Sequence, residues 1–271
     1  MTGRIAFLGA GAMGEALLRG LLQARVVEPA QVLAADVDGA RRTYLAERYG
    51  VQVTEDNKEA VANCLTVILA VKPQVAATVL REVGGQFRPG QRLLSVVAGW
   101  PLGRLRRFLP SGVATVRAMP NTPCLVGRGI TGLSYGEEVT PADRETAKTV
   151  FAAVGEVVEL PEPLLDAVTA LSGSGPAYVF LVIEALTDAG VRMGLPRSTA
   201  LKLVVHTMAG SVALLQETGT HPAALREMVT SPAGTTAEAL AVMEEAGLRG
   251  IFGRAVMAAR RRAQELAREE S

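Results

Sequence analysis

The chain begins with the stretch RIAFLGAGAMGEALLRGL, residues 4–21, in which an apolar run leads into three glycines and then into helix-like apolar spacing. Gly9, Gly11 and Gly14 form a G-x-G-x-x-G pattern between an expected strand and an expected helix. The first glycine permits a tight turn, the second lets the backbone approach a pyrophosphate, and the third lets helix and strand pack closely. The helix N-terminus then favours an anion. The stretch therefore predicts a dinucleotide-binding unit.

The pattern beyond this stretch defines the fold class. Short β-branched runs alternate with helical ones up to about residue 160, which is typical of a mainly parallel sheet. After LPEP (160–163) the strand signal disappears and long apolar-periodic stretches follow. We predict a Rossmann-like, doubly wound α/β dinucleotide-binding domain over 1–160, and an all-α substrate-binding and dimerisation domain over 161–271. The expected strands are 4–8, 32–35, 67–71, 93–97, 114–117, 131–134 and 156–160, and the expected helices of the first domain are 13–24, 41–48, 75–82 and 142–154.

Composition excludes several classes of protein. A 271-residue chain that is 49% apolar with a net charge of +1 can bury a large core and lacks the basic face of a nucleic-acid binder. The longest apolar stretch, 177–186, is interrupted by Glu184 and is shorter than the roughly 18–20 residues that span a bilayer, so no membrane segment is predicted. The N-terminus lacks a secretory pattern, which indicates a cytoplasmic protein. Cys64 and Cys124 have no disulfide or metal-ligand spacing, and no metal site is predicted.

The helix expected after Pro176 is apolar on nearly all sides. Such a helix must be buried all round. In a small helical domain a second copy of the chain hides that surface most easily, so we predict a homodimer through this domain. The alternative, a central helix buried within one chain, remains open at this point.

Asp36 ends the second expected strand, roughly 20 positions after the last glycine of the motif. An acidic residue there accepts hydrogen bonds from the ribose 2′-hydroxyl and repels a 2′-phosphate, which favours NAD(H). Arg41 and Arg42 follow closely, and guanidinium groups hold phosphate through charge-assisted bonds. The alternative is that both arginines are simply exposed on a helix. The sequence thus leaves the cofactor as NADP(H) or NAD(H).

Two further loops, in VILAVKPQ (67–74) and SVVAGW (95–100), follow the third and fourth expected strands. Ligands bind outside the carboxyl ends of parallel strands, so these loops should line the cofactor crevice. Lys72 has two readings, a solvated side chain or a group that contacts the reactants. The predicted cofactor-binding residues are Leu8, Gly9, Ala10, Gly11, Ala12, Met13, Gly14, Asp36, Asn57, Ala70, Val71, Lys72, Pro73, Ala98 and Gly99.

Near the C-terminus, REMVTSPAGTTAEALAVME (226–244) contains two helix-like segments separated by the hydroxyl-rich interruption 231–236. A helix that begins there presents N–H groups to a carboxylate. Alternatively, Thr235 or Thr236 is an N-cap, with Glu238 completing a capping box from Thr235. The two readings are compatible, because a cap leaves other donors free. The predicted substrate-binding donors are Ser231 and the backbone N–H groups of Gly234, Thr235 and Thr236.

The motifs GAGAMG, AVKP, AMPNTP, ALSGSGPAY and SPAGTT occur in this order over essentially the full length, and together they resemble the pyrroline-5-carboxylate reductase family. The resemblance implies NAD(P)H-dependent reduction of the cyclic imine 1-pyrroline-5-carboxylate to L-proline, the last step of proline synthesis. It also implies dimers, often assembled into larger rings. It gives Thr236 a catalytic role, a hydrogen bond to the imine nitrogen, and places Glu162 near the substrate. A protonated imine is already electrophilic, so orientation can supply most of the catalysis.

The chain departs from the family pattern at two positions. Ala233 stands where a glycine is usual; this is harmless at negative φ and strains the loop otherwise. Asp36 replaces a small hydroxyl residue, which puts NADPH preference in question. For SGSG (172–175) two readings stay open: a turn toward the site, or small residues at a close helix crossing.

Two rival functions remain. A 3-hydroxyacid dehydrogenase of similar plan needs a lysine on the helix after its Gly-Ser-Gly motif, and here no lysine occurs before Lys202. A non-catalytic dinucleotide-sensing protein would leave the 231–236 loop without a ligand.

Overall fold

The computed structural model describes residues 3–269; residues 1–2 and 270–271 of the two predicted domains lie outside that range. The chain separates into two compact units. One unit holds the chain up to Ser174 together with the segment from Ala259 onward, and the other is Gly175–Ala258. The last strand ends at Glu159, whereas the unit that contains it continues to Ser174. The domain boundary at residue 160 stays a prediction.

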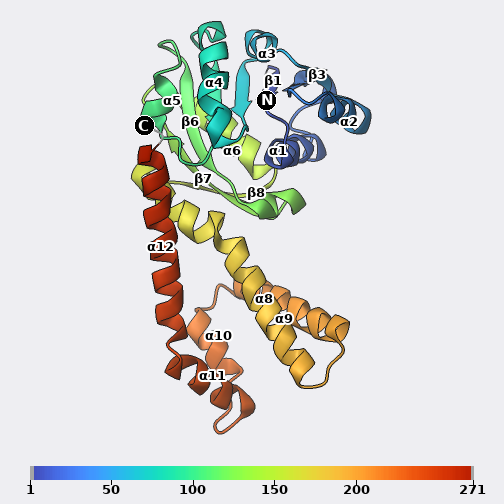
Figure 1. The fold of residues 1–271 in the computed structure, drawn as a ribbon, viewed down its shortest axis with the longest axis vertical. Coiled ribbons are helices and arrows are strands. Elements are labelled where there is room, and N and C mark those ends of the chain that lie inside the picture. Colours follow the sequence, from blue (N-terminus) through green and yellow to red (C-terminus); the bar gives the residue numbers. More distant parts are fainter. Residues whose placement is uncertain (1–2, 270–271) are drawn as a thin grey trace. The chain divides into compact units, whose positions relative to one another are not determined.

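The first unit is built on an eight-stranded sheet with the order β3-β2-β1-β4-β5-β6-β7-β8 (Figure 1). Neighbouring strands are parallel except for β6 and β7, which pair antiparallel. This confirms the mainly parallel, Rossmann-like architecture. The strands are β1 (Ile5–Leu8), β2 (Val32–Ala35), β3 (Gln52–Thr54), β4 (Thr66–Leu69), β5 (Arg92–Ser95), β6 (Ala114–Met119), β7 (Gly129–Tyr135) and β8 (Gly155–Glu159).

Helices cover both faces of the sheet, as a doubly wound fold requires. Side chains alternate along β1, so Ile5 and Phe7 join one buried cluster while Ala6 and Leu8 join the other. Burial on both faces explains why the central strands read as continuous apolar runs. The first cluster is closed by α1 (Ala12–Gln23), α2 (Gly39–Tyr49) and α6 (Pro141–Ala152), and the second by α3 (Asn57–Asn63), α4 (Pro73–Val83) and α5 (Leu102–Arg106).

Among the strands and α-helices up to residue 160, β3, α3 and α5 were not predicted. Strand β3 has three residues, none of them buried, so it lacks an apolar pattern. The helices α3 and α5 have seven and five residues, too few to show helical periodicity. Strand β7 runs antiparallel to β6 because the connection between them is a short loop with one 3-10 turn, whereas a parallel crossover needs a dozen or more residues.

The second unit is entirely helical among the described residues, which confirms the predicted change of class. Helices α8 and α9 pack against each other (Figure 1). Gly190 permits their close approach, since an added Cβ would lie 2.9 Å from the Cβ of Ala200. The helices are α8 (Gly175–Arg192), α9 (Arg197–Thr218), α10 (Pro222–Met228), α11 (Thr235–Glu245) and α12 (Leu248–Glu269), of which α12 continues into the first unit.

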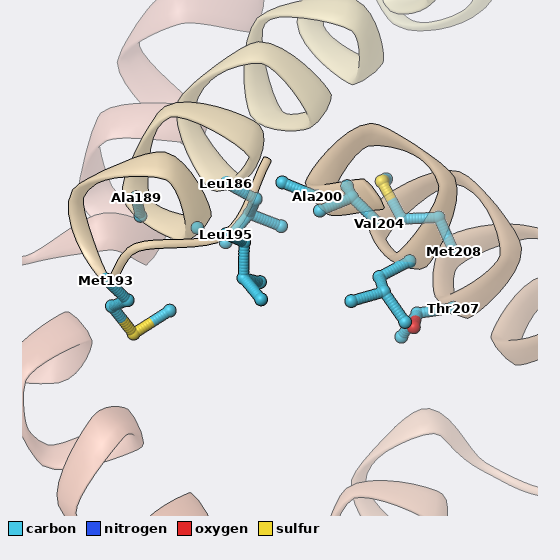
Figure 2. Close-up of a pocket in the computed structure, with 10 residues that line it drawn as sticks. Leu186, Ala189, Met193, Leu195, Ala200, Val204, Thr207 and Met208 are labelled. Atoms are coloured by element: carbon cyan, nitrogen blue, oxygen red, sulfur yellow. The ribbon is translucent and has the colours of Figure 1, made fainter. Parts of the chain in front are cut away.

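Helices α8 and α9 leave much apolar surface uncovered. Phe180 and Leu181 are about two-thirds exposed at 64% and 65%, and the buried residues of α8 are Thr187 and Gly190. The alternative of a central helix buried within one chain is therefore wrong. Between α8 and α9 lies an apolar groove of about 290 Å³, with Leu186 and Val204 among its lining residues (Figure 2).

The same helices pass a simple test for membrane spans. The segments Glu162–Arg192 and Arg197–Thr218 are long and apolar enough to cross a bilayer by length and composition alone. The sequence prediction treated Glu184 as an interruption, whereas the helical segment is apolar enough on average with this residue included. Helices that pair with a second copy of the chain carry the same composition, so this finding fits an intermolecular helix interface equally well.

Candidate active site

The glycine-rich loop after β1 has the geometry that its sequence predicts. Gly9 adopts φ +85°, and an added Cβ would lie 2.8 Å from Val71 Cγ1 and 2.9 Å from the carbonyl oxygen of Ala70. An added Cβ at Gly14 would lie 2.6 Å from the carbonyl oxygen of Gly9. Both positions therefore require glycine, the first for the turn and the second for the packing of α1 against the loop.

Gly11 serves a different purpose. It is the N-cap of α1, and an added Cβ would meet nothing within 4 Å. The first helical bond runs from the Glu15 N–H to the Gly11 carbonyl oxygen at 2.9 Å. The N–H groups of residues 12–14 consequently have no acceptor among the described residues. Open space in front of unpaired N–H groups at a helix N-terminus fits the pyrophosphate of a dinucleotide.

Two of the other predicted cofactor residues, Asp36 and Ala70, contact the glycine loop or the strand before it, whereas the side chain of a third, Asn57, bonds to another helix. Asp36 joins the loop directly, because its Oδ2 accepts a hydrogen bond from the Ala10 N–H at 2.8 Å. Ala70 is tied to β1 through its N–H, which donates to the Leu8 carbonyl oxygen at 2.8 Å. The side chain of Asn57 instead donates to Glu82 on α4 at 3.2 Å. The structure therefore brings Asp36 and Ala70 to the glycine loop and directs Asn57 elsewhere.

The loops after β4 and β5 carry the remaining predicted residues. Lys72 is exposed and is the N-cap of α4, with Pro73 at the first helical position. Its side chain forms no ion pair with the described residues, which supports the solvated reading. Ala98 is exposed, and Gly99 adopts φ +75°, a conformation that favours glycine. Both loops leave the carboxyl ends of parallel strands, as predicted.

A charged cluster at the end of β6 was missed by the sequence analysis. Arg117 is nearly buried, and its guanidinium lies 3.3 Å from Glu162 Oε1 and 3.3 Å from Asp166 Oδ1. Glu162 Oε1 also accepts a hydrogen bond from the Leu102 N–H at 2.6 Å. The carboxylate predicted to lie near the substrate is thus already paired within the first unit. An arginine inside the apolar strand ATVRAM is the signal that could have revealed this cluster.

The motif ALSGSGPAY begins in a π-helical turn, Thr169–Gly173. The side chain of Asn121, in the MPNTP loop, donates to the Ser172 carbonyl oxygen at 3.2 Å and accepts from the Ile130 N–H at 3.0 Å. An added Cβ at Gly173 would lie 2.7 Å from Met119 Cε. The small residue at Gly173 therefore serves close packing against the end of β6, and Asn121 ties two of the motifs together.

The loop at 231–236 presents a helix N-terminus, as predicted, but with a different cap. Helix α11 begins at Thr235, and its N-cap is Gly234, which makes no side-chain capping bond. The predicted N-cap role of Thr235 or Thr236, and with it the capping box to Glu238, is therefore wrong. The hydroxyls of both threonines make no hydrogen bond with the described residues, which leaves them available to a ligand.

One predicted backbone donor is already used. The Gly234 N–H donates to the Ser231 carbonyl oxygen at 3.1 Å and closes the turn, and the first helical bond joins the Glu238 N–H to the Gly234 carbonyl oxygen at 3.3 Å. The N–H groups of residues 235–237 have no acceptor among the described residues. An added Cβ at Gly234 would overlap Ser231 Oγ, so the Ser231 hydroxyl lies directly against this turn.

Ala233, the residue that replaces the usual glycine, adopts φ +55°. A left-handed conformation costs a non-glycine residue about 1–2 kcal/mol, because Cβ crowds the following carbonyl oxygen. The loop is therefore strained, which is the second of the two outcomes considered from the sequence. The left-handed residue is part of the turn that leaves the first N–H groups of α11 without partners among the described residues, so the strain lies at the predicted binding loop.

Ala233→Gly should raise the free energy of unfolding by up to about 1 kcal/mol, because glycine adopts this φ without a Cβ clash. Part of the gain is lost, because glycine also increases the conformational entropy of the unfolded chain. Urea denaturation at a fixed protein concentration measures the change. The matched control is Ala237→Gly inside α11, which should lower stability by roughly 0.5–1 kcal/mol. A loss of stability in Ala233→Gly would contradict the strain.

No group of three or more His, Cys, Asp or Glu side chains in residues 3–269 is arranged to hold a metal ion. Cys64 and Cys124 are both free and buried. Burial raises the pKa of the Cys64 thiol to about 11, so it remains protonated at neutral pH.

Family models match both parts of the chain. The model described as pyrroline-5-carboxylate reductase dimerisation matches residues 162–266, and the one described as NADP oxidoreductase, coenzyme F420-dependent, matches residues 4–99. The pyrroline-5-carboxylate reductase of Synechocystis sp. is 46% identical over 270 residues, covering 99% of this chain and 100% of that protein. The pyrroline-5-carboxylate reductase of Methanosarcina acetivorans is 41% identical over 266 residues, covering 98% of each.

Solved structures give the same result. A pyrroline-5-carboxylate reductase from Coxiella burnetii superposes with a TM-score of 0.93 at 35% identity, covering 98% of this chain and 99% of that one. The Plasmodium falciparum pyrroline carboxylate reductase with NADP bound superposes with a TM-score of 0.88 at 31% identity, covering 97% and 98%. These likenesses extend over the complete fold, including the helical unit.

Proposed function

Because this chain belongs to the pyrroline-5-carboxylate reductase family, we propose that it reduces 1-pyrroline-5-carboxylate to L-proline with a nicotinamide dinucleotide as hydride donor, the final step of proline biosynthesis. The structural feature that best supports this proposal is the N-terminus of α11. There, unpaired N–H groups and two free threonine hydroxyls stand together, and a cyclic imino acid offers them a carboxylate and a ring nitrogen.

The first unit holds the dinucleotide. The unpaired N–H groups of residues 12–14 hold the pyrophosphate, and the space in front of Gly11 lets it approach the backbone. Ala98 and Gly99 border the crevice at the carboxyl ends of the strands. The bound dinucleotide supplies the hydride.

The second unit holds the substrate. Its carboxylate accepts hydrogen bonds from the N–H groups of Thr235 and Thr236 and from the Ser231 hydroxyl, and the positive end of the α11 dipole favours the negative charge. The Thr236 hydroxyl then donates a hydrogen bond to the neutral imine nitrogen, or accepts one from the protonated nitrogen. This bond holds the ring in a fixed orientation. Glu162 forms an ion pair with Arg117 in the first unit, and its place near the substrate stays a prediction.

The reaction needs no strong general acid among these groups. Protonation of the imine nitrogen makes the ring carbon electrophilic, and hydride addition to that carbon converts the iminium directly into the amine of proline. The protein contributes chiefly by orientation, which requires the donor and acceptor carbons to lie about 3–3.5 Å apart.

We extend the proposal to the assembly and its location. The apolar surface of α8 and α9, including the groove in Figure 2, is covered by a second copy of the chain, which is supported by the dimerisation model that matches residues 162–266. Dimers then associate into a larger ring. With the apolar helices buried in that interface, the enzyme works in the cytoplasm and binds neither membrane nor nucleic acid.

A direct assay tests the activity and separates it from its rivals. Purified protein is mixed with NADPH or NADH and racemic 1-pyrroline-5-carboxylate, and the loss of nicotinamide absorbance is followed together with proline formation. Equimolar loss of reduced dinucleotide and gain of proline is the expected result. Oxidation of a 3-hydroxyacid without imine reduction would favour the dehydrogenase, and dinucleotide binding without any turnover would favour a sensor.

Thr236→Ala should lower kcat/KM for the imine roughly ten-fold or more, which corresponds to about one lost hydrogen bond. Thr236→Val keeps the shape of the side chain and should lose as much. Thr235→Ala is the matched control, because it removes a neighbouring hydroxyl and leaves the backbone N–H donors in place. Its kcat/KM should fall by less than about three-fold. Steady-state kinetics at saturating dinucleotide measures all three, and an unchanged kcat/KM in Thr236→Ala would remove this residue from the mechanism.

A further inference from the structure

We propose that this chain prefers NADH to NADPH, and that Asp36 determines the preference; the inference rests on the proposed function, since it concerns the dinucleotide that supplies the hydride. The Asp36 carboxylate lies beside the glycine loop, while the two arginines that could neutralise a 2′-phosphate are already paired with other groups.

Asp36 is held in place by two backbone groups. Its Oδ2 accepts from the Ala10 N–H at 2.8 Å, and its Oδ1 accepts from the Asp38 N–H at 3.0 Å. Each carboxylate oxygen can accept a further hydrogen bond, so the group can still receive the ribose hydroxyls of NADH. A 2′-phosphate in the same place would meet a fixed negative charge without a donor.

Arg41 is paired with Glu15, a carboxylate of helix α1. Its guanidinium forms an ion pair with Glu15, its Nε donates to the Ala10 carbonyl oxygen at 2.6 Å, and it lies 5.1 Å from the centre of the Tyr44 ring. Burial alone would raise the pKa of Glu15, but hydrogen bonds from Tyr49, Arg41 and Tyr44 outweigh it and hold the pKa below its usual value. Glu15 therefore stays ionised at neutral pH and maintains its ion pair with Arg41.

Arg42 is occupied by the backbone of the same turn. Its NH1 donates to the carbonyl oxygens of Asp36 and Val37 at 2.8 and 3.1 Å, and its NH2 pairs with Glu55 at 3.0 Å. These bonds brace the segment that carries the Asp36 carboxylate. Arg42 thus supports the position of Asp36, and two of its guanidinium nitrogens already donate to three acceptors.

Binding of each dinucleotide to the ligand-free, full-length protein by isothermal titration calorimetry tests this inference. The wild-type dissociation constant for NADPH should exceed that for NADH by about ten-fold or more, the effect of placing like charges close together. Asp36→Asn keeps an acceptor for the Ala10 N–H and removes the charge, so it should lower this ratio by about ten-fold. Asp38→Asn removes an equal charge two residues away, retains the capping bond to Ala40 at 2.9 Å, and should leave the ratio within about two-fold.

Three results would overturn the inference. The first is a wild-type protein that binds NADPH as tightly as NADH, which decides the matter even if Asp36→Asn does not fold. The second is an unchanged ratio in folded Asp36→Asn. The third is an Arg41→Ala or Arg42→Ala variant that loses ten-fold more affinity for NADPH than for NADH, since an arginine would then hold the phosphate. Failure to bind either dinucleotide would instead overturn the proposed function itself.

Discussion

Gly11→Ala is expected to weaken dinucleotide binding by about 100-fold while changing the free energy of unfolding by less than about 1 kcal/mol. The methyl group would enter the open space in front of residues 12–14 and push a pyrophosphate away from their N–H groups. Two charge-assisted hydrogen bonds of roughly 1.5–3 kcal/mol each account for a loss of this size. Gly11 has φ −63°, so alanine fits the backbone without strain.

Calorimetric titration with NADH measures the affinity, and urea denaturation measures the stability. The matched control is Gly103→Ala in α5, where an added Cβ likewise meets nothing within 4 Å but no ligand is proposed. Its affinity for NADH should equal that of the wild type. A Gly11→Ala protein that binds NADH within about three-fold of wild type would contradict the placement of the pyrophosphate.

Asp143→Ala should lower the free energy of unfolding by about 3–5 kcal/mol, because it leaves the buried charge of Arg92 without a carboxylate partner. Asp143 Oδ1 lies 2.8 Å from Arg92 Nε, and the two side chains are only 10% and 11% exposed. Asp143 Oδ2 also accepts from the N–H and the hydroxyl of Thr140, at 3.0 and 2.6 Å, which completes the capping box of α6. The substitution therefore removes an ion pair and one half of the capping box, while the bond from the N–H of residue 143 to the Thr140 hydroxyl can remain.

The effect of Asp143→Ala should depend on pH. Burial alone would raise the pKa of Asp143, but hydrogen bonds from Thr140 and the Arg92 guanidinium outweigh it and hold the pKa below its usual value. A carboxyl whose folded pKa is lowered stabilises the protein above its unfolded pKa of about 3.9, and loses that contribution as pH falls through the folded value. The difference between wild type and variant should thus be full at pH 7 and shrink below about pH 4.

Urea denaturation at one protein concentration, repeated at several pH values, measures this difference. Glu145→Ala on the same helix is the matched control, since the Glu145–Lys148 pair is exposed and its loss should leave the stability close to that of the wild type. A loss below 1 kcal/mol in Asp143→Ala at pH 7, or a loss that grows in acid, would show that the pair does not stabilise the fold as described.

The sequence predicts this site best where the requirement is local. The structural roles of Gly9 and Gly14 follow from spacing alone, because strand, turn and helix are consecutive, and the structure shows the turn and the close packing as expected. The approach of a pyrophosphate to Gly11 stays a prediction. The start of α11 is predictable for the same reason. Contacts between distant segments of the chain are not predictable in this way. Arg117 forms ion pairs with Glu162 and Asp166 only because the fold brings these segments together, and no local sequence pattern links them.

Two details of the α11 loop were beyond the sequence for a different reason. Alanine usually adopts negative φ, so the residue type at 233 argued against the value of +55° that the turn imposes. The N-cap is Gly234 and not the predicted threonine, because a hydrogen bond from the Gly234 N–H to the Ser231 carbonyl oxygen closes the turn at that residue. In both cases the closure of the turn outweighed the local preference of the side chain.

The first compact unit is discontinuous in sequence, which matters for the order in which the chain is made. Ala263 and Leu266 of α12 line a cavity of about 130 Å³ with Gly99 and Arg117, and Leu266 Cβ lies 3.9 Å from a Cβ built on Gly99. These residues are synthesised after the whole of the helical unit Gly175–Ala258. The nascent dinucleotide unit therefore stays incomplete while the helical unit is being synthesised, and a chain that terminates prematurely before residue 259 releases it with that cavity open.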